Sequence, residues 1–244
     1  MALSLRGIAE ISAIDGADVT LTHPVGIAEN DVVYIGHGVG DALDITITIV
    51  TTGYTQLTEV YSADSASAGN LAIWRKRMGA TPDSTAVCDG SGSALSGTVA
   101  VEHVWIGVDT TTSEDATTTT AIGEADVSAP NSPEIVTVTA NAIVLSIAEI
   151  AQTDTTVTAP SGYSNQVDIN ASESHDQTVG ISSILVVSPG AENPAAWTNF
   201  ATTAGRGWCA ATVAIRPAAA GAAVEGILYG PRNYTDGLTS FWSR

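Results

Sequence analysis

The sequence predicts an all-β fold: a jelly-roll-like antiparallel β-sandwich formed by two repeated halves and followed by a C-terminal arm. The composition supports this, because Thr, Ser, Ala, Gly and Val dominate, and β-branched residues with glycine turns favour pleated strands. Short apolar runs are separated by turn residues, and no segment keeps a long helical period. Similar motifs also recur at an offset of about 110 residues.

Strand signals follow one another along most of the chain. Residues 18–22 and 44–50 alternate apolar and polar side chains, which is the period of a half-buried strand. At most one turn of helix is expected, at 195–204. The expected strands are 18–22, 31–35, 44–50, 71–74, 98–108, 135–139, 142–147, 179–187 and 208–215.

The internal repeat consists of several motif pairs that occur in the same order. One such pair means little, but a nearly constant offset across all of them indicates a structural duplication. The pairs are 30–33 with 141–144, Gly53-Tyr54 with Gly162-Tyr163, 73–80 with 184–191, and 99–106 with 210–215.

The repeat predicts two halves, 15–109 and 127–217, after an N-terminal segment at 1–14. Each half supplies strands with one apolar face, and that face must be covered. Packing the halves face to face gives one sandwich over 15–217. Two small barrels in tandem are the alternative. The Thr-rich stretch 111–120 is polar and low in complexity, so we expect an exposed loop there.

The composition changes in the last segment, 218–244, which we interpret as an arm. Four of the 13 aromatic residues lie within the last 16 residues. The arm either folds back on its own sandwich or docks on a neighbouring subunit, where aromatic and Arg side chains are the usual anchors. The candidate partner contacts are Tyr229, Arg232, Tyr234, Phe241 and Trp242, with Leu3 and Leu5 of the N-terminal segment as a second set.

The net charge of the chain limits the classes of molecule that it is expected to bind. The chain has 26 acidic and 8 basic residues, a net charge of −18, and neither Lys nor Arg between Met78 and Gly205. Nucleic acid is therefore not expected as a partner, because phosphate neutralisation needs clustered cations. Residues 75–77 are basic, but alternate side chains of a strand face opposite sides. The acidity suits solubility at high local concentration.

Membrane insertion and export are not expected either. No apolar run reaches the length of a membrane span. Arg6 and Glu10 interrupt any signal-peptide core near the N-terminus. The two cysteines, Cys88 and Cys209, are too few for a disulfide framework and lack metal spacing. A bridge between them is one option, and two reduced thiols are favoured.

No catalytic set or cofactor site stands out. The four histidines are dispersed, and His37 lies in a glycine run without the lysine of a phosphate loop, so a strand ending in a flexible turn is expected there. His103 is expected at the surface or at an interface. Glu114-Asp115 and Glu124 with Asp126 lack the pattern of a calcium loop and are expected to be solvated.

The tryptophans raise the question of a sugar-binding platform. Three of the four in the body lie in strand-like runs, which favours core packing over glycan binding. They are Trp74, Trp105 and Trp208, and the fourth is Trp197.

Several segments, in order, resemble a family of minor virion structural proteins of tailed phages. Residues 24–33 are similar to the opening of that family, and Gly53-Tyr54 is similar to its next landmark. Residues 71–77 resemble a following strand, and residues 208–217 resemble the closing motif. The resemblance spans about 15–217. The chain departs from the pattern at Asn30, where glycine is usual, and extends beyond it by the whole arm.

The resemblance implies an assembly role without catalysis or cofactors. Such proteins are capsid decoration or cement proteins, head fibres, or tail and fibre subunits. We therefore expect a virion protein, assembled in the host cytoplasm, that acts most specifically as a capsid cement. Its expected partners are the major capsid protein or tail proteins and further copies of itself, a trimer being one option. A tail or fibre subunit and a carbohydrate-binding receptor module are the alternatives.

Overall fold

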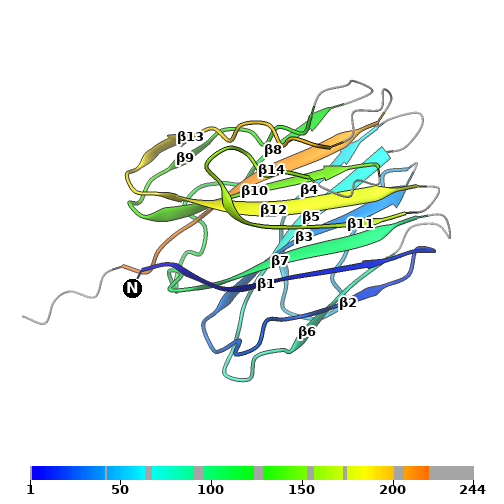
Figure 1. Ribbon diagram of the computed structural model, residues 1–244. Helices are drawn as coiled ribbons and strands as arrows, with labels where there is room; N and C mark the ends of the chain where they lie inside the picture. The colour runs from blue at the N-terminus through cyan, green and yellow to red at the C-terminus, as the bar shows by residue number, and fades with distance from the viewer. Residues whose placement is uncertain are drawn as a thin grey trace, which may run out of the picture.

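The computed structural model describes residues 2–41, 43–63, 68–90, 96–123, 129–152, 157–172, 175–200 and 206–219. These residues form two five-stranded antiparallel sheets, packed face to face, and two short two-stranded pairs (Figure 1). No helix occurs in the described ranges, so none there is long and apolar enough to cross a membrane. The predicted all-β antiparallel sandwich is confirmed, and the tandem-barrel alternative is wrong.

The first half of the chain supplies one whole sheet. Its order is β1-β7-β3-β5-β4, and β2 pairs with β6 outside it. The strands are β1 (Ser4–Ala13), β2 (Val19–Thr22), β3 (Val32–Asp41), β4 (Thr55–Ser62), β5 (Ala68–Arg77), β6 (Thr85–Cys88) and β7 (Thr98–Ile106).

The second half supplies the other sheet with the corresponding order. That order is β8-β14-β10-β12-β11, with β9 paired to β13 outside it. The strands are β8 (Thr119–Gly123), β9 (Ile135–Thr137), β10 (Ala142–Ile150), β11 (Ser164–Ala171), β12 (Gln177–Val186), β13 (Gly190–Glu192) and β14 (Trp208–Ile215).

The two halves therefore correspond strand by strand, in both chain order and sheet order. Turn residues correspond as well: Asn30 and Asn141 precede equivalent strands with φ of 69° and 61°, and Gly53 and Gly162 have φ of 88° and 87°. Asparagine and glycine tolerate this left-handed conformation. The strands extend beyond the predicted halves, because β1 lies within 1–14 and β8 lies before residue 127.

The halves pack around a pseudo-two-fold axis that runs along the strands. On one side of this axis β1 faces β11 and β7 faces β12. On the other side the equivalent strands face each other, β8 against β4 and β14 against β5. Gly36 of β3 lies against Val179, whereas Gly40 lies against His175, so β3 runs antiparallel to β12 and in the same direction as β10. Equivalent turns of the two halves consequently lie at the same end of the sandwich.

The main core lies between the sheets, and smaller clusters lie on their outer faces. Inward side chains such as Tyr34, Leu71, Leu145 and Ile181 form the central cluster. The β2–β6 pair, which we call the first flap, covers the outer face of the first sheet, and the β9–β13 pair, the second flap, covers part of the other. Covering both faces explains why every residue of β3 and β10 is buried.

Four local predictions need correction, and the last of them is the expected strand 44–50, within which only Ile49 forms a β-bridge, to Cys88. The glycine run around His37 is the middle of β3, which continues to Asp41, and is not a flexible turn. The stretch 111–120 is only partly an exposed loop, because Ser113 and Asp115 are buried and 119–120 belong to β8. No helical turn forms in the described part of 195–204, which is residues 195–200. Packing against the second half accounts for the first two differences.

Candidate functional site

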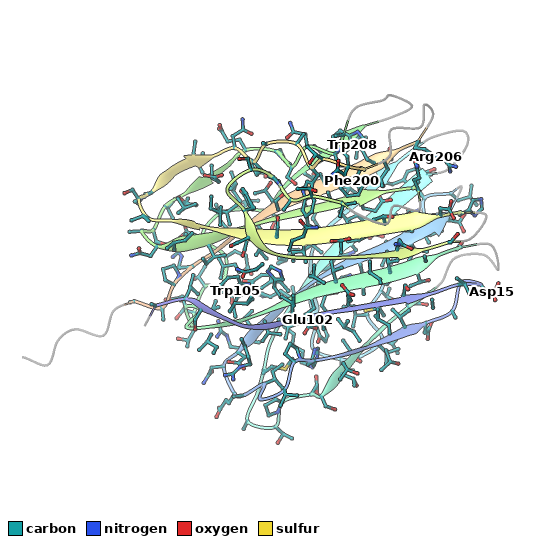
Figure 2. The ribbon with its side chains drawn as sticks, viewed as in Figure 1. Asp15, Glu102, Trp105, Phe200, Arg206 and Trp208 are labelled. Atoms are coloured by element: carbon teal, nitrogen blue, oxygen red, sulfur yellow. The ribbon has the colours of Figure 1, made fainter. Side chains whose placement is uncertain are left out.

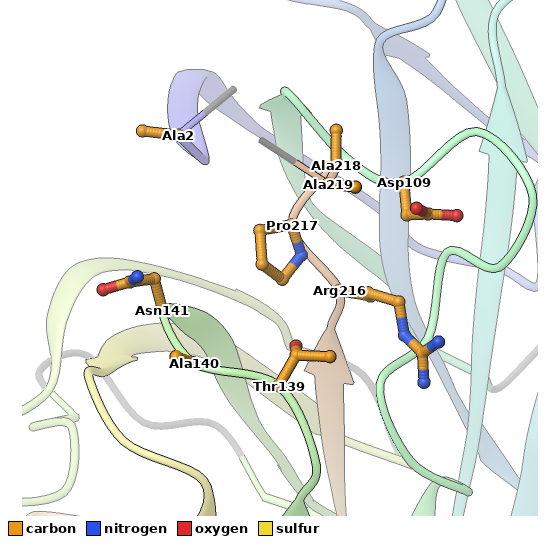
Figure 3. Close-up of a pocket in the computed structure, with 9 residues that line it drawn as sticks. All are labelled: Ala2, Asp109, Thr139, Ala140, Asn141, Arg216, Pro217, Ala218 and Ala219. Atoms are coloured by element: carbon orange, nitrogen blue, oxygen red, sulfur yellow. The ribbon is translucent and has the colours of Figure 1, made fainter. Parts of the chain in front are cut away.

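The described chain begins and stops at the same end of the sandwich, which we call the terminal end. Ala2 and Ala219 line one pocket there, of about 640 Å³, together with Asn141 of the turn before β10 (Figure 3). Pro217 and Ala218 form another part of its wall. The C-terminal arm therefore continues from the rim of this pocket.

Exposed apolar side chains lie beside the pocket. Val138 is 59% exposed, Leu185 is 52% exposed and Val187 is 63% exposed. The Asn141 backbone N–H donates to the Val187 carbonyl at 3.2 Å, which joins the two segments that carry these side chains. We call Val138, Leu185 and Val187 the terminal patch. These exposed apolar side chains mark the terminal end as a candidate interaction surface.

Strand alternation explains how the patch arises. On β12, Val179 and Ile181 fill the central core at every second position. Leu185 continues that series and pairs with Ile143, yet it is half exposed because it lies at the end of the strand. The side chains that are core in mid-strand thus become surface at the terminal end.

Most cations of the described chain also lie at the terminal end, and acids or carbonyls hold them. Arg75 Nη1 lies 2.7 Å from Glu114 Oε2, and Arg216 Nε lies 3.3 Å from Asp115 Oδ1. The remaining contacts are Arg6 with Asp31, Lys76 with Asp83, and Arg77 with the Asn30 and Asp109 carbonyls and the Ser113 hydroxyl. Charge at this end is therefore nearly balanced.

The opposite end of the sandwich is acidic. Figure 2 shows Asp15 there, together with Arg206, whose guanidinium donates to the Ala151 carbonyl at 3.2 Å. The turns at this end carry further acids, namely Asp18, Asp44, Asp89 and Asp176. The net negative charge of the described chain is thus concentrated away from the pocket.

The first titratable network lies under the first flap. Glu102 Oε2 of β7 lies 2.7 Å from His23 Nδ1, and Tyr54 Oη lies 3.1 Å from His23 Nε2. Burial raises the pKa of Glu102, while the contact with His23 lowers it. Because the Glu102 and His23 side chains have no exposed surface, this network fastens the flap and offers no open site for a substrate.

The second network lies between the sheets. Gln177 Nε2 donates to Glu149 Oε1 at 2.5 Å, and the Cys209 thiol contacts the Gly69 carbonyl at 3.5 Å. Burial raises the pKa of Glu149 to about 8, although the hydrogen bonds from Cys209 and Gln177 lower it. Glu149 is therefore largely protonated at neutral pH. The one sequence signal of this position is an acid inside an otherwise apolar run.

The remaining histidines of the strands are internal. His103, expected at the surface or an interface, is fully buried, and its Nε2 lies 2.8 Å from the Asn165 carbonyl of the facing sheet. Burial lowers the pKa of His103 to about 4 and that of His37 to about 3, so both rings are neutral at pH 7. The prediction for His103 was wrong because alternation on β7 points it toward the other half.

The carboxylates that were considered for calcium serve the fold instead. Asp115 is buried and accepts hydrogen bonds from the Val138 and Thr139 backbone N–H groups at 2.6 and 3.0 Å. Glu114 accepts from Tyr34 and pairs with Arg75. Among the described side chains, no three of His, Cys, Asp and Glu gather as a metal site. Glu124 and Asp126 lie outside the described residues.

Tryptophan and cysteine side chains are internal as well. Trp105, Trp197 and Trp208 are at most 7% exposed, and Trp74 packs against clusters on the outer face of the first sheet. The preference for core packing is confirmed for these residues. Both cysteines are buried and free, as favoured.

The predicted contact residues fall into two groups. Leu3 and Leu5 are partly buried and pack against the central core, which anchors the start of β1. The arm residues Tyr229, Arg232, Tyr234, Phe241 and Trp242 lie outside the described residues. Sequence reasoning missed Val138, Leu185 and Val187, because an apolar residue at the end of a strand looks the same as one in the core.

No family model, curated protein or solved structure matches this chain. The geometry of the chain itself therefore carries the functional argument. Its titratable networks are closed, and the terminal end combines a pocket with exposed apolar side chains nearby.

Proposed function

We propose that this chain is a structural protein that acts by binding, and that it decorates or cements the head of a tailed-phage particle. The terminal end carries the proposal, because a pocket, the terminal patch and the start of the arm all meet there. The motifs that resemble those of minor virion proteins, in the same order, support a tailed-phage particle as the structure to which the chain binds. The partners are then the major capsid protein and further copies of this chain.

The mechanism is additive burial at many equivalent sites. Each copy contributes a modest apolar contact, and symmetry repeats that contact around the shell. A rigid body suits this role, since the two sheets share one core and the inner network ties them together. The protein needs no catalytic group for such stabilisation.

Two alternatives use the same surfaces differently. A tail or fibre subunit would make similar contacts at another place on the particle. A carbohydrate-binding receptor module needs exposed aromatic faces, and the tryptophans of the body have other uses. The second alternative therefore has less support.

The direct test compares particles assembled with and without this chain. A cement raises the temperature at which heads release their DNA and slows their disruption by a chelator. Particles of equal stability in both assays would rule out the cement role. Labelling the chain and locating the label by electron microscopy distinguishes a head position from a tail position.

A further inference from the structure

We propose that the terminal patch and its pocket receive residues 220–244 of the C-terminal arm of a second copy of this chain. Two copies then meet terminal end to terminal end and exchange arms. This inference rests on the proposed assembly role and names the partner of one surface.

The acceptor surface is apolar and open. Val138, Leu185 and Val187 are each more than half exposed. The pocket beside them has the volume of a small ligand site, which accommodates one or two aromatic side chains. An apolar surface next to a pocket suits aromatic anchors.

Charge permits this approach. The chain has a net charge of −18, so two copies repel each other in most orientations. At the terminal end, however, Arg6, Arg75 and Arg216 offset Asp31, Glu114 and Asp115. The arm is also balanced, with Arg232 and Arg244 against Glu225 and Asp236. Bringing two terminal ends together therefore meets the least repulsion.

The arm has the composition of an apolar ligand. Residues 227–242 include Ile227, Leu228, Tyr229, Tyr234, Leu238, Phe241 and Trp242. Burying an aromatic side chain removes about 150–250 Å² from water, so four of them per arm account for about 600–1,000 Å². Two exchanged arms would reach about 1,200–2,000 Å², the size of a stable specific interface.

The spacing favours a second copy over the arm's own body. Ala219 already lies on the pocket wall, so an arm that entered its own pocket would need only a tight reversal. Instead, the first aromatic of the arm, Tyr229, follows ten residues later, and ten residues span up to about 34 Å. That reach suits an acceptor on a facing copy. Exchange between two identical ends also closes the assembly by two-fold symmetry.

The test uses the full chain in sedimentation equilibrium over a wide concentration range. Val187→Asp changes the acceptor, and Tyr229→Ala with Trp242→Ala changes the donor. Val50→Asp is the matched control, because Val50 is 58% exposed and its backbone N–H donates to Val87 of the first flap, away from the patch. We expect a dimer for the unchanged chain and the control, and at least tenfold weaker association for the acceptor and donor variants.

Mixing the two variants sharpens the test. A donor variant keeps its patch and an acceptor variant keeps its arm, so an equimolar mixture restores one of the two contacts and forms a heterodimer. A chain that stays monomeric, or an association that Val187→Asp and Val50→Asp weaken equally, would overturn the inference. So would hydrogen exchange showing that the arm of a monomer is protected and that Val187→Asp removes the protection, because the arm would then dock on its own body.

The test of arm exchange and the test of the cement role can fail independently. A chain that dimerises through its arm but neither binds nor stabilises particles contradicts the cement role and leaves the arm exchange standing. A chain that stabilises particles as a monomer contradicts the exchange alone.

Discussion

In the first half of the sandwich a glutamate–histidine contact fastens the flap to its sheet, whereas in the second half hydroxyl and indole groups do so. Glu102 and Thr212 stand at equivalent places, since they pair with Ile35 and Ser146 on equivalent strands. Glu102 contacts His23, while the Thr212 hydroxyl donates to the Pro133 carbonyl at 2.6 Å. Trp197 Nε1 donates to Ser146 at 2.9 Å and adds a second neutral fastening.

The halves also differ where they face each other. The first half has Gly38 and Gly69 at the positions where the second has Glu149 and Gln177. A Cβ on Gly69 would collide with the Glu149 carboxyl group, and a Cβ on Gly38 would lie 2.6 Å from Val179 Cγ2. The large side chains of one half thus occupy the space left by the glycines of the other. Strand order is shared, but the halves are complementary and not interchangeable.

The largest expected effect removes the contact between Glu102 and His23. Glu102→Ala leaves His23 buried without its acid and opens a cavity, so we expect a loss of about 3–5 kcal/mol in the free energy of unfolding. Thr212→Ala, at the equivalent place, should cost about 1 kcal/mol. Urea denaturation measures both. Equal losses would show that the two flaps are held alike.

The next effect tests the complementary core. Gly38→Ala places a methyl group against Val179, so we expect a loss of about 1–3 kcal/mol from overpacking. Gly79→Ala is the control, because a Cβ there meets nothing within 4 Å. Thermal unfolding of the two variants decides the matter, and an unchanged melting temperature for Gly38→Ala would contradict the close approach of the halves.

A third effect concerns pH and sharpens the comparison of Glu149 with Gly38. The pKa of Glu149 is raised from its ordinary value of 4.5 to about 8, so the folded state holds a proton that the unfolded state releases. Stability contributed by the neutral form is complete below pH 4.5 and is lost as pH rises toward 8, by at most about 1.4 kcal/mol per pH unit. Glu149→Gln should flatten this slope. Denaturation midpoints at several pH values measure this slope. Identical slopes for the unchanged chain and for Glu149→Gln would contradict the prediction that Glu149 is protonated in the folded core.

Much of the architecture could be predicted because it is local. Alternating runs such as Val19–Thr22 and repeated turn residues such as Gly53 and Gly162 indicated strands and duplication without any long-range information. The contacts that hold the halves together are not local. His23 and Glu102 are 79 residues apart, and Glu149 meets Gly69 across the two sheets. No spacing rule predicts such pairs.

The candidate site could be predicted only in part. The aromatic arm was evident from composition, because no globular context was needed to notice it. The terminal patch was not, since Leu185 has the same pattern as Ile181 and becomes surface only where the facing sheet stops covering it. Whether a side chain at a strand end is buried depends on how far the facing sheet extends. The sequence of that one strand does not contain this information.

The uneven distribution of charge has a geometric consequence for any array of copies. If neighbouring copies attach to a support by their nearly neutral terminal ends, instead of pairing with one another end to end, their acidic opposite ends point the same way. Like charges within about 8 Å repel at physiological salt. This repulsion moves the acidic ends of neighbouring copies further apart than their terminal ends. Such an array bends outward, and a convex support, such as the outside of a closed shell, relieves the repulsion more than a flat one. Added salt should reduce this preference for curvature.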